Sequence, residues 1–188
     1  TGFSTEADQH QYARLAREHE RLEHEIDELI QQAISIAERI GTPRIRGYTL
    51  MQRGEIMSGR YLEEKSDLVR GPLRAKAWVR WRVLRYPLLE RILVYGWKRS
   101  KRLATLYKEY RCDFLMAASL FESCNDPLEA QAYYNLANQL RSSYRFGHAQ
   151  MFLKKARATA ERYGDQWVMQ QSDRLKEILK KRNRDIPN

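Results

Sequence analysis

The chain has 188 residues, of which 43% are hydrophobic, so it is long enough to bury a core and short enough to form one domain. Charges interrupt every apolar run well before the roughly 18 residues that a membrane-spanning helix needs, which predicts a soluble protein. The net charge of +10 is uneven, because residues 70–111 hold 13 basic and 2 acidic side chains whereas residues 1–41 hold 4 basic and 9 acidic ones. That asymmetry indicates an acidic partner or surface for the middle of the chain.

Residues 1–41 predict one long helix. Its apolar residues recur at alternating intervals of three and four, as in the heptad seam of a coiled coil: Tyr12, Leu15, Leu22, Ile26, Leu29, Ala33, Ile36 and Ile40, with His19 in the one gap. Gly41, followed by Pro43, ends the helix. Such a stripe packs either on the chain's own domain or against the same helix of a second copy, so a homodimer through this helix is one of two interpretations.

Residues 43–125 predict further helical hairpins of less regular pattern. A helix is expected from about residue 44 to 58, with a break at the sequence SGRY and a short helix over about 62–69, before the turn signal RGP at 70–72. From Leu103 a helical apolar stripe runs until the sequence CNDP ends it. No segment alternates with a period of two, so the fold is predicted to be all-α.

The two cysteines, Cys112 and Cys124, lie in or at the end of that last helical stripe. We expect both thiols to be buried or half-buried. Their number and spacing match neither a disulfide framework nor a metal site, which favours a reducing compartment such as the cytoplasm.

The most regular pattern of the chain falls within residues 126–163. It runs Tyr133, two positions, Leu136-Ala137, two positions, Leu140, then a polar turn with Phe146-Gly147, then Ala149, three positions, Leu153, and Ala156. This resembles the tetratricopeptide repeat, a pair of antiparallel helices of about 34 residues. Small residues at Ala137 and Ala149 would let the two helices approach closely. A generic helical bundle with one such hairpin is the alternative.

Fainter copies of the pattern flank this unit. Trp167 lies 34 residues after Tyr133, and an apolar set 35 residues upstream exchanges large and small residues with the second helix of the unit: Phe114, Ala117, Ala118 and Phe121 against Ala149, Phe152, Leu153 and Ala156. Residues 164–188 turn polar and basic, as a capping helix and tail do. The resemblance implies hairpins stacked in a right-handed solenoid or compact helical array, with a long N-terminal helix and a C-terminal capping helix.

The resemblance also implies a non-catalytic protein–protein interaction module, scaffold or regulatory adaptor. In this family a concave face, lined by the first helix of each pair, holds a segment of a partner protein. The matching positions here, which are expected to face outward, are Tyr134, Asn135, Asn138, Arg141 and Ser142. A solvated polar face with no partner is the alternative.

A basic and aromatic segment within residues 70–111 is the second candidate for binding. Its members are Arg74, Lys76, Trp78, Arg80, Arg82, Arg85, Trp97, Lys98, Arg99, Lys101 and Arg102. Basic side chains neutralise phosphates and exposed aromatic rings stack on unpaired bases, so single-stranded nucleic acid is one ligand. An anionic membrane surface is a second. In the third interpretation the aromatic rings are core and the charges are solvated or meet the acidic N-terminal helix.

The sequence carries no pattern of an enzyme site. His19 and His24 are five residues apart, the wrong interval for two metal ligands on one helical face, and no phosphate-binding loop or nucleophile elbow is found. We therefore expect no catalytic residues, no metal and no cofactor.

Overall fold

The computed structural model describes residues 6–70 and 97–184. Within these ranges the chain forms six helices and no strand, which confirms the all-α class. The chain divides into two compact units, Thr1–Gly41 and Thr42–Asn188. The basic and aromatic stretch between residues 71 and 96 lies outside the described residues, as does the tail beyond residue 184.

The first unit holds α1 (Glu6–Ile40), the long helix expected from the heptad pattern. It ends where the sequence predicts, because Gly41 takes a positive φ of +75° that L side chains rarely adopt. Its polar side chains form pairs one turn apart, such as Arg21 with Glu25 at 3.4 Å. Much of the apolar seam is exposed, at Leu15, Leu22, Ile26, Leu29, Ile36 and Ile40.

The second unit begins with α2 (Pro43–Arg70), which is one continuous helix. The predicted break at Ser58 to Tyr61 is therefore wrong. A glycine in a helix interior costs only about 1 kcal/mol, and the burial of Ser58 and Tyr61 on either side of Gly59 offsets that cost. Tyr61 is buried in the core, and the buried Ser58 hydroxyl donates to the carbonyl of Glu55 at 2.8 Å.

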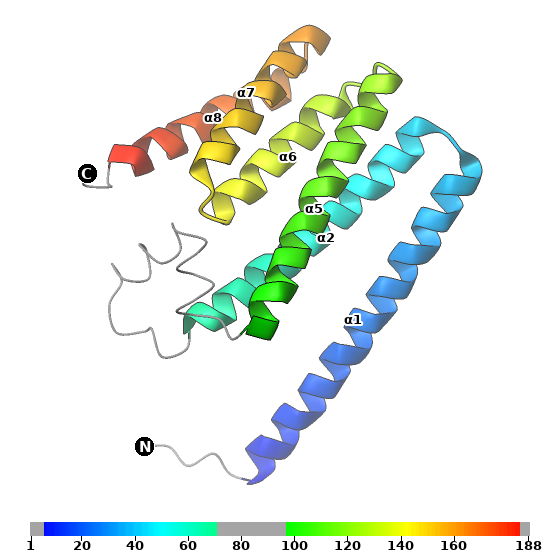
Figure 1. Cartoon of the computed structure of the whole chain (residues 1–188), viewed down its shortest axis with the longest axis vertical. Helices are drawn as coiled ribbons and strands as arrows, with labels where there is room; N and C mark the ends of the chain where they lie inside the picture. Colours follow the sequence, from blue (N-terminus) through cyan, green and yellow to red (C-terminus); the bar gives the residue numbers. More distant parts are fainter. Residues whose placement is uncertain (1–5, 71–96, 185–188) are drawn as a thin grey trace. The chain divides into compact units, whose positions relative to one another are not determined.

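The helix α5 (Trp97–Ser123) runs antiparallel to α2 and packs along it (Figure 1). Two glycines of α2, one heptad apart, allow this close approach. A Cβ atom at Gly47 would lie 2.9 Å from the Phe121 ring, and one at Gly54 would lie 3.2 Å from the Phe114 ring. Both rings are fully buried, so the phenylalanine rings of α5 pack directly against the backbone of α2 at its glycines.

A hairpin of α6 (Leu128–Ser142) and α7 (Phe146–Tyr163) follows. The turn is formed by residues 143–145, with Tyr144 at φ 61°, and Phe146 and Gly147 already belong to α7. The turn predicted at Phe146-Gly147 is thus displaced by a few residues. Ala137 and Ala149 are both fully buried in the core, as the spacing of the pattern predicts.

The last helix, α8 (Gln166–Arg184), packs on α7 and more lightly on α6. Gly164 takes a φ of 72°, and the Asp165 carboxylate accepts a hydrogen bond from the backbone N–H of Val168 at 3.0 Å, which caps the start of α8. Figure 1 shows that successive helices of this unit alternate in direction. All eight residues of the two related apolar sets, in α5 and in α7, are buried.

Both cysteine thiols are exposed, so the expectation of buried or half-buried thiols is wrong. Cys112 lies between Tyr110 and Asp113 along α5, on the side of the helix that these two fully buried residues leave to solvent. Cys124 lies in the turn after α5, where its thiol donates to the carbonyl of Leu120 at 3.3 Å.

Candidate functional site

The candidate site is a face of α6 that continues onto α2 and α8. The structure brings together on α6 all five side chains predicted for a partner-binding face: Tyr134, Asn135, Asn138, Arg141 and Ser142. Each of them is half-buried, so the prediction that they face outward holds only in part. The reason is that α6 contacts α2 on one side and α8 on the other.

On the α2 side, Asn135 is tied to Glu55. The Asn135 amide nitrogen donates to the Glu55 carboxylate at 2.6 Å. Burial raises the pKa of the Glu55 carboxyl above its ordinary value, because the charged form loses hydration. Asn135 keeps a carbonyl oxygen and a second N–H, so it retains hydrogen-bonding groups for a ligand.

On the α8 side, Tyr134 meets Trp167. Their ring centroids lie 5.8 Å apart in an edge-to-face arrangement, and Trp167 is still 53% exposed. Burial raises the pKa of the Tyr134 hydroxyl, and the positive charges of Arg141 and Arg174 partly oppose that shift. Tyr134 is therefore a neutral aromatic group whose hydroxyl feels the positive charges of Arg141 and Arg174.

The C-terminal part of the face is held by a small polar network within α6. Arg141 donates to the Asn138 side-chain oxygen at 3.2 Å and to the Ser142 hydroxyl at 3.3 Å. These bonds hold the Arg141 guanidinium in position. Among the contacts that the structure describes, the guanidinium has no acidic partner. Arginine and exposed aromatic rings are the residues that most often dominate binding energy at protein interfaces.

The second predicted surface, the basic and aromatic segment, lies largely outside the described residues. Arg74, Lys76, Trp78, Arg80, Arg82 and Arg85 fall there, and Trp97, Lys98 and Arg99 are described only as the first turn of α5. Lys101 and Arg102 are exposed. Arg102 pairs with Glu64 of α2 at 2.5 Å, so its charge is already partly neutralised.

Three members of the α6 face escaped the sequence prediction, namely Glu55, Trp167 and Arg174. Trp167 was expected only as the opening aromatic residue of a further helix. The sequence gives little indication that Glu55 and Arg174 belong to this face. A charged residue on an amphipathic helix shows no spacing from which its neighbour on another helix can be predicted.

In the described part of the chain, no group of three His, Cys, Asp or Glu side chains is placed to hold a metal ion. Among the same residues, no helix is long and apolar enough to cross a membrane. No protein-family model, no curated protein and no solved structure matches the chain.

Proposed function

We propose that the chain is a non-catalytic protein–protein interaction module, a scaffold or adaptor built on tetratricopeptide-like helix pairs. The observation that carries this proposal is the face of α6. It joins polar and aromatic side chains of three helices that lie side by side: Glu55 of α2, the α6 set around Asn138, and Trp167 of α8.

The order of helix packing supports the proposal. The helix α2 packs with α5 and α6 packs with α7, while α5 contacts α6 and α7 contacts α8. The first helix of each pair also contacts the next first helix, as α2 does α6 and α6 does α8. A chain of stacked helix pairs needs these neighbour contacts, and it leaves the first helices to line one common surface.

The chemistry of the face suits a peptide segment. The side chains of Asn135, Asn138 and Arg141 offer donors and acceptors for the backbone of a bound chain. Trp167 adds an exposed aromatic surface beside them. We therefore assign the face to a segment of a partner protein that is held mainly by hydrogen bonds, with one apolar anchor on Trp167.

The experiment is a selection of displayed random peptides on the full chain, followed by affinity measurements on the enriched sequences. The test variant is Asn138→Ala/Arg141→Ala, whose lost hydrogen bonds lie within α6 itself. The control is Lys108→Ala/Ser119→Ala, two exposed positions of α5. We expect the test variant to weaken binding at least tenfold and the control to leave it unchanged. Enriched peptides that bind the test variant as tightly as the wild type would refute the proposal, as would a selection without enrichment.

A further inference from the structure

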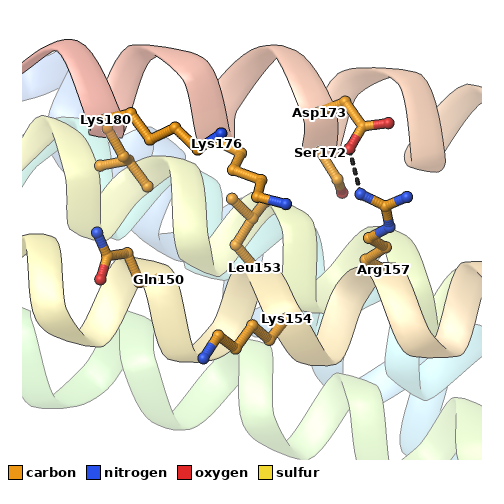
Figure 2. A pocket seen from close by; sticks show the side chains of 9 residues that line it. Gln150, Leu153, Lys154, Arg157, Ser172, Asp173, Lys176 and Lys180 are labelled. Atoms are coloured by element: carbon orange, nitrogen blue, oxygen red, sulfur yellow. Dashed lines mark hydrogen bonds and ion pairs between the residues drawn. The ribbon is translucent and has the colours of Figure 1, made fainter.

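A groove between α7 and α8 lies apart from the α6 face. It encloses a cavity of about 220 Å³. Its floor is apolar, formed by Leu153 of α7 and Leu179 of α8, and basic side chains stand along both edges (Figure 2). The volume is below the roughly 300 Å³ at which cavities for drug-sized ligands begin. The cavity therefore suits one or two side chains of a larger partner.

Two of the basic side chains at the groove are uncompensated. Lys154 of α7 and Lys176 of α8 have no acidic partner within the described ranges, residues 6–70 and 97–184. Two others are already paired, since Arg157 bridges to Asp173 across the groove and Lys180 pairs with Glu177 at 2.8 Å. Figure 2 shows Lys176 reaching from α8 over Leu153. The groove thus presents free positive charge on both sides of an apolar floor.

The Ser172 hydroxyl is the observation that points to a ligand. Ser172 is 1% exposed and lines the cavity, and its oxygen has no hydrogen-bond partner in the described structure. An unsatisfied buried hydroxyl destabilises a fold, and such groups are rare in native proteins unless a water or a ligand completes them. In Figure 2 the side chain points from α8 toward α7, beside the Arg157 guanidinium. It is placed to donate a hydrogen bond to an acceptor that enters the groove.

The position of the groove in the fold indicates the shape of the ligand. Ser172 and Leu175 of α8 lie 35 residues after Ala137 and Leu140 of α6, one more than the 34 residues between Tyr133 and Trp167, and all four are buried. In α6 the small residue is covered within the packing of α5, α6 and α7. In α8 the cavity lies over the corresponding small residue, Ser172, instead. The groove therefore lies where a helix that pairs with α8 would pack, as α7 packs against α6.

We propose that the α7–α8 groove binds an acidic amphipathic helix of a partner protein. The helix lays its apolar face on Leu153 and Leu179, as amphipathic helices do in hydrophobic grooves. One of its carboxylates enters the cavity, where the Ser172 hydroxyl donates to it and Lys176 neutralises it. A second carboxylate meets Lys154 on the opposite edge. Charge complementarity on both edges fixes the orientation of the helix and excludes basic helices.

The first test compares two labelled synthetic peptides in fluorescence anisotropy with the full chain. Both are 21-residue amphipathic helices with leucine on the apolar face, and they differ only in carrying glutamate or glutamine beside it. We expect the glutamate peptide to bind at least tenfold more tightly and the difference to shrink as salt is raised. Equal affinities, or no binding of the glutamate peptide, would overturn the proposal.

The second test places the site on the protein. The variant Lys154→Glu/Lys176→Glu is expected to weaken binding of the glutamate peptide at least tenfold. The matched control, Arg46→Glu/Lys108→Glu, makes the same change of charge at exposed positions of α2 and α5 and is expected to change the affinity less than twofold. Equal losses in the two variants would mean that the peptide responds only to net charge, which would refute the groove.

A third variant separates binding from folding. Ser172→Ala removes a hydroxyl that the folded protein leaves unsatisfied, so its melting temperature is expected to stay the same or rise. The same variant is expected to bind the glutamate peptide several-fold more weakly. A drop in melting temperature would show that the hydroxyl has a partner within the fold, and unchanged binding would show that it does not meet the ligand. Because these variants spare the α6 face, the outcome is independent of the peptide selection proposed for that face.

Discussion

The two helix pairs of the second unit both bring their helices close together, but they use different residues at the contact. In the α2–α5 pair, glycines on α2 accept large rings from α5, such as Phe121 against Gly47. In the α6–α7 pair, Ala137 and Ala149 are both small and the larger side chains around them fill the core. The comparison teaches that a stacked pair needs one close contact between helices, while the residues that provide it are free to vary.

The pairs also differ in how charge ties them together. Asp113 of α5 is fully buried and accepts two hydrogen bonds from Arg53 of α2, one of them at 2.7 Å. The corresponding ion pair between α6 and α7 is more exposed on its cationic side: the exposed Arg162 of α7 bonds to Glu129 at the start of α6, whose carboxylate is itself buried. A buried pair is far more sensitive to the loss of one partner than a pair at the surface.

The largest expected effect comes from breaking the buried pair of α2 and α5. Arg53→Ala leaves the Asp113 carboxylate buried without a cation, so the free energy of unfolding should fall by about 3–5 kcal/mol. Urea denaturation measures the change. The double variant Arg53→Ala/Asp113→Ala removes the orphaned charge as well and should lose less than the single one. A loss no larger than that of a surface pair would contradict the account.

The next effect tests the small residues of the α6–α7 pair. Ala149→Val adds two methyl groups at a fully buried position and should cost about 1–3 kcal/mol through overpacking. The control is Ala158→Val, an exposed position of the same helix, where only helix propensity changes and the cost is about 0.5 kcal/mol. Thermal unfolding of the two variants measures the difference. Equal costs would mean that α6 and α7 do not depend on close contact at Ala149.

A smaller effect tests the glycines of α2, where the same substitution is expected to lower the free energy of unfolding at one position and to raise it at another. Gly47→Ala gains helix propensity but drives a methyl group against the buried Phe121 ring, so we expect a net loss of about 1 kcal/mol. Gly59→Ala has open space around the new methyl group and should gain about 0.5–1 kcal/mol. Chemical denaturation of both variants measures the two signs. Stabilisation by Gly47→Ala would show that the ring shifts freely.

The smallest effect concerns pH and the tie between α2 and α6. Burial raises the pKa of Glu55 in the folded state, although the hydrogen bond from Asn135 favours the charged form. The folded state therefore binds this proton more tightly than the unfolded state, and the contribution of Glu55 to stability falls as the pH rises above its unfolded pKa of about 4.3.

The variant Glu55→Gln keeps an acceptor for Asn135 and removes the buried charge. It should melt slightly higher than the wild type at pH 7, and the two proteins should converge near pH 4. Melting curves across this range measure the effect. A variant that melts lower at pH 7 would mean that the charged form of Glu55 is stabilised by the fold.

The sequence predicted the α6–α7 pair well because alanine spacing and the aromatic positions around it follow from close packing. It misplaced the end of α2, because a local signal at Gly59 outweighed the burial of Tyr61, which depends on a distant helix. The α2–α5 pair was predicted only as irregular hairpins. Gly47 and Gly54 are seven residues apart, as are Phe114 and Phe121, but nothing in either segment indicates that it packs against the other.

The same limit applies to the sites. The sequence could place the five α6 residues on one face because one helix carries them all, and their role in binding a partner stays a prediction. Glu55 joins them only through the packing of α2 on α6, and the groove at Ser172 depends on the space between two helices. A hydroxyl without a partner is a property of the folded neighbourhood, so no pattern in the sequence could indicate it.

The most direct test of the central claim is a chemical-shift map of the isotope-labelled full chain with a peptide enriched by the selection. We predict the largest changes at the backbone amides of Tyr134 to Arg141 and at the indole N–H of Trp167, with smaller changes at Glu55 of α2. Changes confined to α1 or to the exposed side of α5, with α6 unaffected, would contradict the assignment of the α6 face as the binding surface.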